Sequence, residues 1–253
     1  MLKNRVIPCL LLSNNGLVKT KKFKSPKYVG DPINAIRIFN EKEVDEIIVL
    51  DIMTTRDHKE PNYNLIEQFA SECFMPLCYG GGIHTIDQAK HLFAIGVEKV
   101  CLQTSALKNL DIISRISDQF GSQSVLISID VKKNWFGTYQ LYSTASGKTL
   151  SRPWLEFLIN AVSAGAGEVV LNSVDRDGMM QGMDLELIRE ASTSISVPLI
   201  AVGGVGSFAD IKAAISAGAS AVGAGAFFVF QGPHRAVLIT YPQYNELETL
   251  LTK

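Results

Sequence analysis

The stretches MPLCYGGGIHT at residues 75–85 and VPLIAVGGVGS at residues 197–207 decide the fold. Each is an apolar run that ends in glycines, and the two lie 122 residues apart. The same offset relates Gly96 to Gly218 and Glu46 to Glu168. Similarity at one fixed offset indicates a repeated supersecondary unit. We therefore expect two similar halves, roughly residues 1–122 and 123–253.

Eight apolar runs, each followed by a helical pattern, extend along the chain. They lie at about 5–11, 45–51, 75–80, 98–103, 123–130, 167–172, 198–203 and 220–225. Strands that alternate with helices favour a parallel sheet, and eight such units predict a single (β/α)₈ barrel over residues 1–253. An open, doubly wound sheet is the alternative. In the first unit, Asp31 suits a helix N-cap and Pro32 suits the first helical position.

About 20 residues separate the first strand from this helix. A loop of that length without structure is uncommon in a compact domain unless it serves as a lid or a binding loop. It carries the basic sequence KTKKFKSPK at 19–27. These lysines fit a solvated loop as well as a functional lid, and the sequence leaves both open.

Composition excludes several classes of protein. Hydrophobic residues make up 47% and charged residues 19%, and no apolar run reaches the roughly 18 residues that span a bilayer. The net charge of −1 gives no basic field for nucleic acid. The first residues, MLKNRVIPCLLL, fit a strand better than a signal peptide, so we expect a cytoplasmic protein. The four cysteines lack CxxC spacing and are expected to be buried thiols, with no metal or organic cofactor.

Glycine-rich turns follow the third and seventh strands. Chemistry in a (β/α)₈ barrel sits where the strands end, and phosphate is held there by glycine turns that feed helix N-termini. Gly81-Gly82 precedes a helix expected near Thr85, and Gly203-Gly204 precedes one expected near Phe208. Small-residue turns follow the neighbouring strands and extend each candidate site: Gln103-Thr104-Ser105 and Gly225-Ala226. Two matched turns predict two phosphates on one small-molecule substrate, although tight turning alone also explains such glycines.

The motif Asp175-Arg176-Asp177-Gly178 follows the sixth strand, at the same end of the barrel. There Asp177 and Gly178 could bind substrate hydroxyls or orient a phosphate loop. Asx-turn chemistry alone also explains the motif.

These residues together resemble the cyclase subunit (HisF) of imidazole glycerol phosphate synthase, and the resemblance covers nearly the whole chain. The stretches that carry it are RVIPCL at 5–10, GLVK at 16–19, GDP at 30–32, DEIIVLDI at 45–52, FGSQSV at 120–125, SID at 128–130, GAGE at 165–168 and DRDG at 175–178. The resemblance implies a barrel that docks a glutaminase subunit on its N-terminal face and conducts ammonia to its C-terminal face. There the ammonia reacts with a bisphosphorylated formimino-carboxamide ribonucleotide.

The resemblance also implies roles for individual residues. Asp130 matches the catalytic aspartate, and an aspartate where a barrel strand ends is a candidate general base. Lys19 and Asp51 match further substrate-binding residues. The channel entrance matches Arg5, Glu46, Lys99 and Glu168, whose opposite charges would compensate one another. Glu98 and Gln123 match the glutaminase interface, and His84 lies on the third loop.

The sequence departs from the family pattern at the mouth. The family has a second catalytic carboxylate where this chain has Leu11, opposite Asp130 when the first and fifth strands are aligned, and leucine cannot transfer a proton. Gln103 replaces a usual asparagine, and Asn172, also expected at the substrate, replaces a small hydroxyl residue.

Three functions follow from this pattern. The first is the cyclase of histidine synthesis. The second is a paralog of the kind found with surface-polysaccharide genes, which conducts ammonia from a glutaminase to a sugar-amidinating enzyme. The third is the related isomerase of the histidine pathway, which Leu11 and the charged ring both disfavour.

Overall fold

The computed structural model describes residues 4–251, which form a closed barrel of eight parallel strands. The barrel strands are β1 (Arg5–Ser13), β4 (Ile47–Asp51), β5 (Leu77–Gly80), β6 (Lys99–Leu102), β7 (Val125–Lys133), β10 (Glu168–Ser173), β11 (Leu199–Val202) and β12 (Ala221–Ala224). Pairing of β1 with β12 and of β7 with β10 closes the ring. The (β/α)₈ prediction is confirmed, and the open sheet is wrong.

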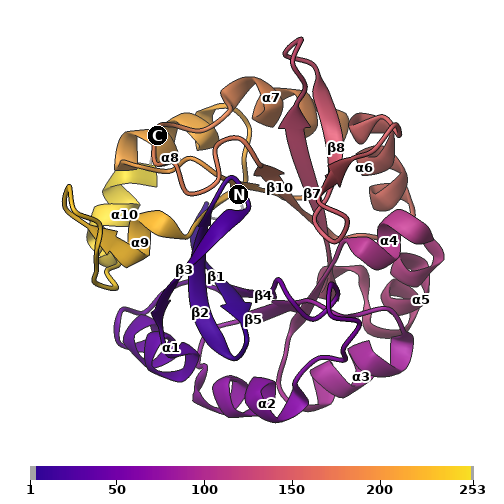
Figure 1. Ribbon diagram of the computed structural model, residues 1–253, viewed down its shortest axis with the longest axis horizontal. Helices are drawn as coiled ribbons and strands as arrows, with labels where there is room; N and C mark the ends of the chain where they lie inside the picture. Colours follow the sequence, from indigo (N-terminus) through magenta and orange to yellow (C-terminus); the bar gives the residue numbers. More distant parts are fainter. Residues whose placement is uncertain (1–3, 252–253) are drawn as a thin grey trace.

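Helices surround the barrel, as the view down its axis shows (Figure 1). They are α1 (Pro32–Glu41), α2 (Tyr63–Glu72), α3 (Ile86–Ala94), α4 (Thr104–Lys108), α5 (Asp111–Phe120), α6 (Trp154–Ser163), α7 (Leu185–Ser194), α8 (Phe208–Ser216), α9 (Ala226–Val229) and α10 (Tyr244–Leu251), with a 3₁₀ turn at Ser122–Ser124. Asp31 caps α1 by accepting from the Asn34 backbone N–H, and Pro32 takes the first position, as predicted. No helix within residues 4–251 is long and apolar enough to cross a membrane.

Apolar side chains fill both the barrel and the layer between barrel and helices. Ile7, Ile48 and Leu126 point into the interior and are fully buried, because strands of a parallel sheet are covered on both faces. Cys9, Cys78 and Cys101 join this interior cluster, and all four cysteines are free thiols. Of the four, Cys73 alone is only partly buried. Burial removes far more apolar surface from water than any surface contact could, so this core is the main source of stability.

The segment between the first strand and α1 is not a structureless loop, and that expectation was wrong. It forms an antiparallel hairpin of β2 (Gly16–Lys21) and β3 (Lys24–Gly30), and β2 continues the ladder of β1. A second hairpin extends β7 through β8 (Tyr139–Ser143) and β9 (Lys148–Thr149). A short third one joins β13 (Phe230–Gln231) to β14 (Ala236–Val237). The first two hairpins rise from the ends of barrel strands and therefore lie at the mouth, the end where the strands finish.

Candidate functional site

A cavity of about 710 Å³ opens at the mouth of the barrel. All fourteen predicted catalytic and substrate-binding residues line it: Lys19, Asp51, Gly81, Gly82, Gln103, Thr104, Asp130, Asn172, Asp177, Gly178, Gly203, Gly204, Gly225 and Ala226. The structure thus brings the predicted site residues together around one volume, which is large enough for a small-molecule ligand.

The two glycine turns require glycine. Gly81 and Gly203 have φ values of +129° and +99°, which L side chains rarely adopt. A Cβ on Gly81 would lie 2.6 Å from the Asp51 carbonyl oxygen, and one on Gly204 would lie 2.2 Å from the Gly182 carbonyl oxygen. The backbone therefore approaches neighbouring loops closely at both turns.

Each glycine turn leads into a helix that begins with a capping box. Thr85 and Gln88 form it at α3, and Ser207 and Asp210 form it at α8, again 122 residues on. The short helices α4 and α9 behave differently. Their N-caps, Gln103 and Gly225, make no side-chain cap hydrogen bond, so the first N–H groups of these helices keep their capacity to bind an anion at the cavity wall.

Asp130 lies buried in β7, where three uncharged donors hold its carboxylate. Gln103 Nε2 and Thr144 Oγ1 donate to Oδ2, and Ser128 Oγ donates to Oδ1 at 3.2 Å. Burial raises the pKa of Asp130 to about 6, while these donors oppose the rise. A carboxylate in this state takes and returns a proton near neutral pH.

Sequence reasoning missed Thr144. It lies in the β8–β9 turn, and its backbone N–H also donates to Gln103 Oε1 at 3.2 Å. Arg56 fixes the same turn by donating to the Thr144 carbonyl oxygen. The hairpin was not predicted, and without it nothing in the sequence places Thr144 beside Asp130.

Two of the predicted mouth residues hold the protein's own loops. Asp177 Oδ2 accepts from Thr20 Oγ1 at 2.7 Å and from the Phe23 backbone N–H at 3.1 Å, so it fastens the β2–β3 hairpin. Asp51 Oδ1 accepts from the backbone N–H groups of Met53 and Thr54. Each carboxylate therefore has a structural task in addition to any contact with substrate.

Lys19 reaches into the cavity from β2. Its Nζ donates to the Cys9 carbonyl oxygen, and a Cβ on Gly225 would lie 2.6 Å from that Nζ. Burial lowers the pKa of Lys19 to about 8. An anion held at Gly225 would meet this ammonium group directly and would stabilise its charge.

Leu11 lies across the mouth from Asp130. β1 and β7 are four strands apart in either direction around the barrel, and both side chains line the cavity. Asn172 stands beside Asp130 on the neighbouring strand, and its Oδ1 is buried without a hydrogen-bond partner among the described residues. Neither Leu11 nor Asn172 can replace a carboxylate in proton transfer.

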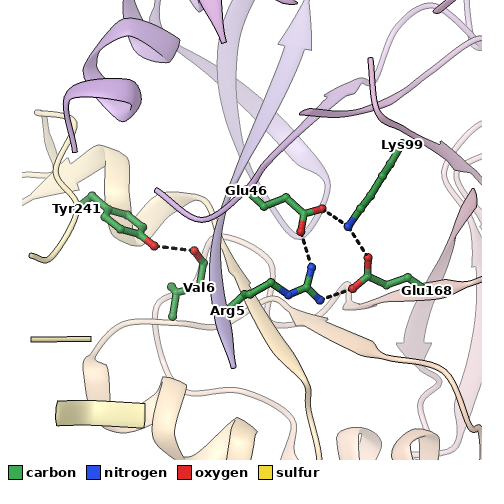
Figure 2. Close-up of polar contacts among 6 residues, drawn as sticks. All are labelled: Arg5, Val6, Glu46, Lys99, Glu168 and Tyr241. Carbon is green, nitrogen blue, oxygen red and sulfur yellow. Dashed lines mark hydrogen bonds and ion pairs between the residues drawn. The ribbon is translucent and has the colours of Figure 1, made fainter. Parts of the chain in front are cut away.

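A closed ring of four charges fills the opposite end of the barrel, the entrance end, where the strands begin (Figure 2). Arg5 forms ion pairs with Glu46 and Glu168, and Lys99 Nζ lies 2.7 Å from Glu46 Oε1 and 3.0 Å from Glu168 Oε2. Burial lowers the pKa of Arg5 and Lys99, but the two neighbouring carboxylates raise it by more. The pKa of each cation therefore lies above its ordinary value. Both cations of the ring therefore stay ionised.

The remaining predicted residues are exposed. Glu98 and Gln123 lie at the entrance end, each just before a barrel strand. His84 Nδ1 is 2.8 Å from the Gly82 carbonyl oxygen, so the ring braces a glycine turn. Within residues 4–251, no group of three or more His, Cys, Asp or Glu side chains is arranged to hold a metal ion.

Fold and site together define a (β/α)₈ barrel whose mouth carries two matched glycine turns on one cavity. The chain belongs to the family described as "Histidine biosynthesis protein", whose model matches residues 5–233. It is 54% identical over 249 residues to the "Putative imidazole glycerol phosphate synthase subunit hisF2" of Pseudomonas aeruginosa, with 98% of this chain and 99% of that relative covered.

More distant relatives carry the unqualified name. The chain is 37% identical over 207 residues to the "Imidazole glycerol phosphate synthase subunit HisF" of Streptococcus sanguinis, with 82% of each chain covered. It is 37% identical over 228 residues to the protein of the same name from Exiguobacterium sibiricum, with 90% of this chain and 91% of that relative covered.

Proposed function

We propose that this chain is a cyclase-type subunit of imidazole glycerol phosphate synthase. It takes ammonia from a glutaminase subunit and converts the bisphosphorylated formimino-carboxamide ribonucleotide to imidazole glycerol phosphate and an aminoimidazole carboxamide ribonucleotide. The observation that carries the proposal is the pair of glycine turns, related by 122 residues, on one cavity with Asp130. The names of the relatives support the same activity. The compartment that goes with this activity is the cytoplasm.

Different residues at the mouth bind the two phosphates and remove the proton. One phosphate binds at Gly81, Gly82 and the start of α4, and the other at Gly203, Gly204 and the start of α9, where Lys19 adds its charge. Ammonia addition to a carbonyl carbon and the later ring closure both require removal of a proton. Asp130 is the base for these steps, because it is buried, oriented by three donors and titrates near neutral pH.

Ammonia enters the barrel at the charged ring. Arg5, Lys99 and the two glutamates encircle the barrel axis where the strands begin, below the interior cluster. A neutral ammonia molecule crosses such an apolar interior at lower cost than an ammonium ion, because burial of an unpaired charge is strongly unfavourable.

Direct assay tests this function. Purified protein receives the bisphosphorylated ribonucleotide with an ammonium salt at high pH, which supplies ammonia without a glutaminase. We expect imidazole glycerol phosphate as product, and its absence would contradict the cyclase function. Leu11→Asp is the matched variant: it supplies a second carboxylate across from Asp130 and is expected to raise the rate by about 10²–10⁴-fold if proton transfer at that position limits turnover.

Leu11 favours a second candidate function. A chain with one carboxylate at its mouth but with an intact charged ring suits an ammonia conduit, in which a sugar amidotransferase, for example one of polysaccharide (O-antigen) synthesis, consumes the ammonia. Turnover at a rate typical of an enzyme, 1–10³ s⁻¹, in the assay above would exclude this function. No turnover by the natural sequence and recovery in Leu11→Asp would support it.

A further inference from the structure

The two glycine turns divide the rim of the mouth into two arcs. The turns follow β5 and β11, and the short helices α4 and α9 follow β6 and β12. In the closed order of strands, β7 and β10 therefore lie between the two turns on one side of the barrel, and β1 and β4 lie between them on the other (Figure 1). A ligand that reaches from one turn to the other lies between these two pairs of strands.

The two pairs of strands carry side chains of opposite character at the mouth. Asp130 and Asn172 are partners in register on one side, and Leu11 and Leu50 are partners in register on the other. Leu50 lies 122 residues before Asn172, so the two pairs occupy equivalent places in the two halves. All four side chains line the cavity. One wall of the mouth is therefore polar, and the facing wall is apolar.

The side chain of Asn172 makes no hydrogen bond within residues 4–251. The three donors that hold Asp130 come from other residues. Asn172 Oδ1 is buried against the second glycine turn, because a Cβ on Gly203 would lie 3.1 Å from that oxygen. The amide therefore presents its Nδ2, a hydrogen-bond donor, to the cavity.

The fold does not require asparagine at this position. The equivalent position in the other half holds Leu50, which packs against the apolar interior of the barrel. A buried carbonyl oxygen without a donor lowers stability, so Asn172 costs stability that leucine would not. A residue that breaks a packing rule beside a cavity, and that offers a free donor there, is a candidate for contact with a ligand.

We propose that Asn172 is a second catalytic residue of the cyclase reaction, whose Nδ2 stabilises the negative charge that forms on the substrate's carbonyl oxygen when ammonia adds. The nitrogen of ammonia forms a bond to the carbonyl carbon, and the electron pair of the C=O π bond moves to the oxygen. Asp130 takes a proton from the positively charged nitrogen and returns it to this oxygen, so that protons and charge balance. The inference rests on the proposed function, because the carbonyl group belongs to the bisphosphorylated ribonucleotide.

The polar wall supplies both groups that this step needs. Asp130 and Asn172 are register partners on adjacent strands, so a base and a neutral donor approach one carbonyl group from the same side. Leu11 and Leu50 cover the opposite side of the ligand with apolar surface. A donor held in place before the reaction stabilises an oxyanion more than water does, because no reorganisation is needed as the charge forms.

Steady-state kinetics of Asn172→Leu separate this role from a structural one. We expect kcat to fall about 10²–10³-fold, the effect of removing one oxyanion donor, while the KM for the ribonucleotide changes little. Asn172→Thr should keep kcat within about tenfold of the natural value, because a hydroxyl group also donates. The melting temperature of Asn172→Leu should not fall, which shows that this variant folds. Asn34→Leu makes the same change on the exposed side of α1 and should alter neither kcat nor KM.

Infrared difference spectroscopy tests the contact without turnover. The probe is the bisphosphorylated ribonucleotide labelled with ¹³C at the carbonyl carbon that ammonia attacks, bound in the absence of ammonia. A hydrogen bond to the oxygen weakens the C=O bond. The labelled band should therefore lie at lower frequency in the natural sequence than in Asn172→Leu.

Two results would overturn the role of Asn172: the same band position in both proteins, or the same kcat. A lower band in the natural sequence without any turnover would support the contact and contradict the cyclase function. Failure of the natural sequence to bind the ribonucleotide would overturn both.

Discussion

Asp130 combines burial with three uncharged donors from the N-cap of α4, β7 and the β8–β9 turn. Its pKa of about 6 leaves it ionised at neutral pH and protonated in mild acid. We expect the turnover rate, divided by the concentration of free ammonia, to rise with pH through about 6 and then to level off. Asp130→Asn should lower turnover by about 10²–10⁴-fold, because the amide keeps the shape but cannot accept the proton. Steady-state rates across pH 5–9 measure the pH profile of the natural sequence and the loss of turnover in Asp130→Asn. An unchanged rate in the variant would exclude Asp130 as the base.

The same residue links folding stability to pH. Burial raises the pKa of Asp130 above its unfolded value of 3.8, so the native state binds more protons than the unfolded state between pH 4 and 6. The contribution of Asp130 to stability is therefore present in acid and is lost as pH rises through about 6. The shift corresponds to roughly 3 kcal/mol. Urea unfolding of the natural sequence and of Asp130→Asn should show their stability difference moving by this order between pH 4 and 7.5, and a constant difference would contradict the raised pKa.

Among the elements, the β2–β3 hairpin depends on one side chain outside it. Asp177 accepts from Thr20 Oγ1 and the Phe23 backbone N–H, and its carbonyl oxygen accepts from the Lys22 backbone N–H. Asp177→Ala removes the first two bonds, each worth about 1.5–3 kcal/mol to a charged group. We expect amide hydrogens in residues 16–30 to exchange about 10–100-fold faster by mass spectrometry.

Asp175→Ala is the neighbouring control for the hairpin. Asp175 Oδ2 accepts from the Lys133 backbone N–H, so its loss should loosen β7 and leave residues 16–30 protected. Equal exchange in both variants would mean that the β1–β2 ladder alone holds the hairpin.

The sequence predicted the barrel strands well and the mouth hairpins not at all. Buried parallel strands are continuous apolar runs, and all eight were placed to within a few residues. β3 is Lys24–Gly30, a largely exposed stretch with two lysines and a proline, and it gives no strand signal of its own. It forms because β2 continues from β1 and offers an edge to pair with. Hairpin pairing of this kind brings Thr144 to the site, so the sequence did not predict it. The glycines and Asp130 were predicted because they follow or end strands that the apolar pattern marks.

For the whole molecule, the two halves match closely at the glycine turns and their helices, but not at the entrance. Both glycine turns, both capping boxes and both uncapped short helices recur 122 residues on. In the charged ring only the glutamates recur, Glu46 and Glu168, while both cations, Arg5 and Lys99, belong to the first half. The matched turns suit the ligand with two phosphates that we propose, whereas the charged ring differs between the two halves.

This asymmetry predicts how the two halves hold together. Co-expressed fragments 1–122 and 123–253 should assemble into one barrel, because each alone leaves two strand edges unpaired, those of the β1–β12 and β6–β7 ladders. Glu168 is the ring residue that pairs across the halves, to both Arg5 and Lys99, while Glu46 pairs within the first half. Glu168→Gln should weaken assembly about tenfold or more, for a loss of roughly 1.5 kcal/mol. Glu46→Gln, the same change at the equivalent position, should not weaken it, because Glu168 then remains to bind both cations. Titration of one labelled fragment with the other measures the two affinities, and equal weakening would show that the ring stabilises each half separately instead of joining them.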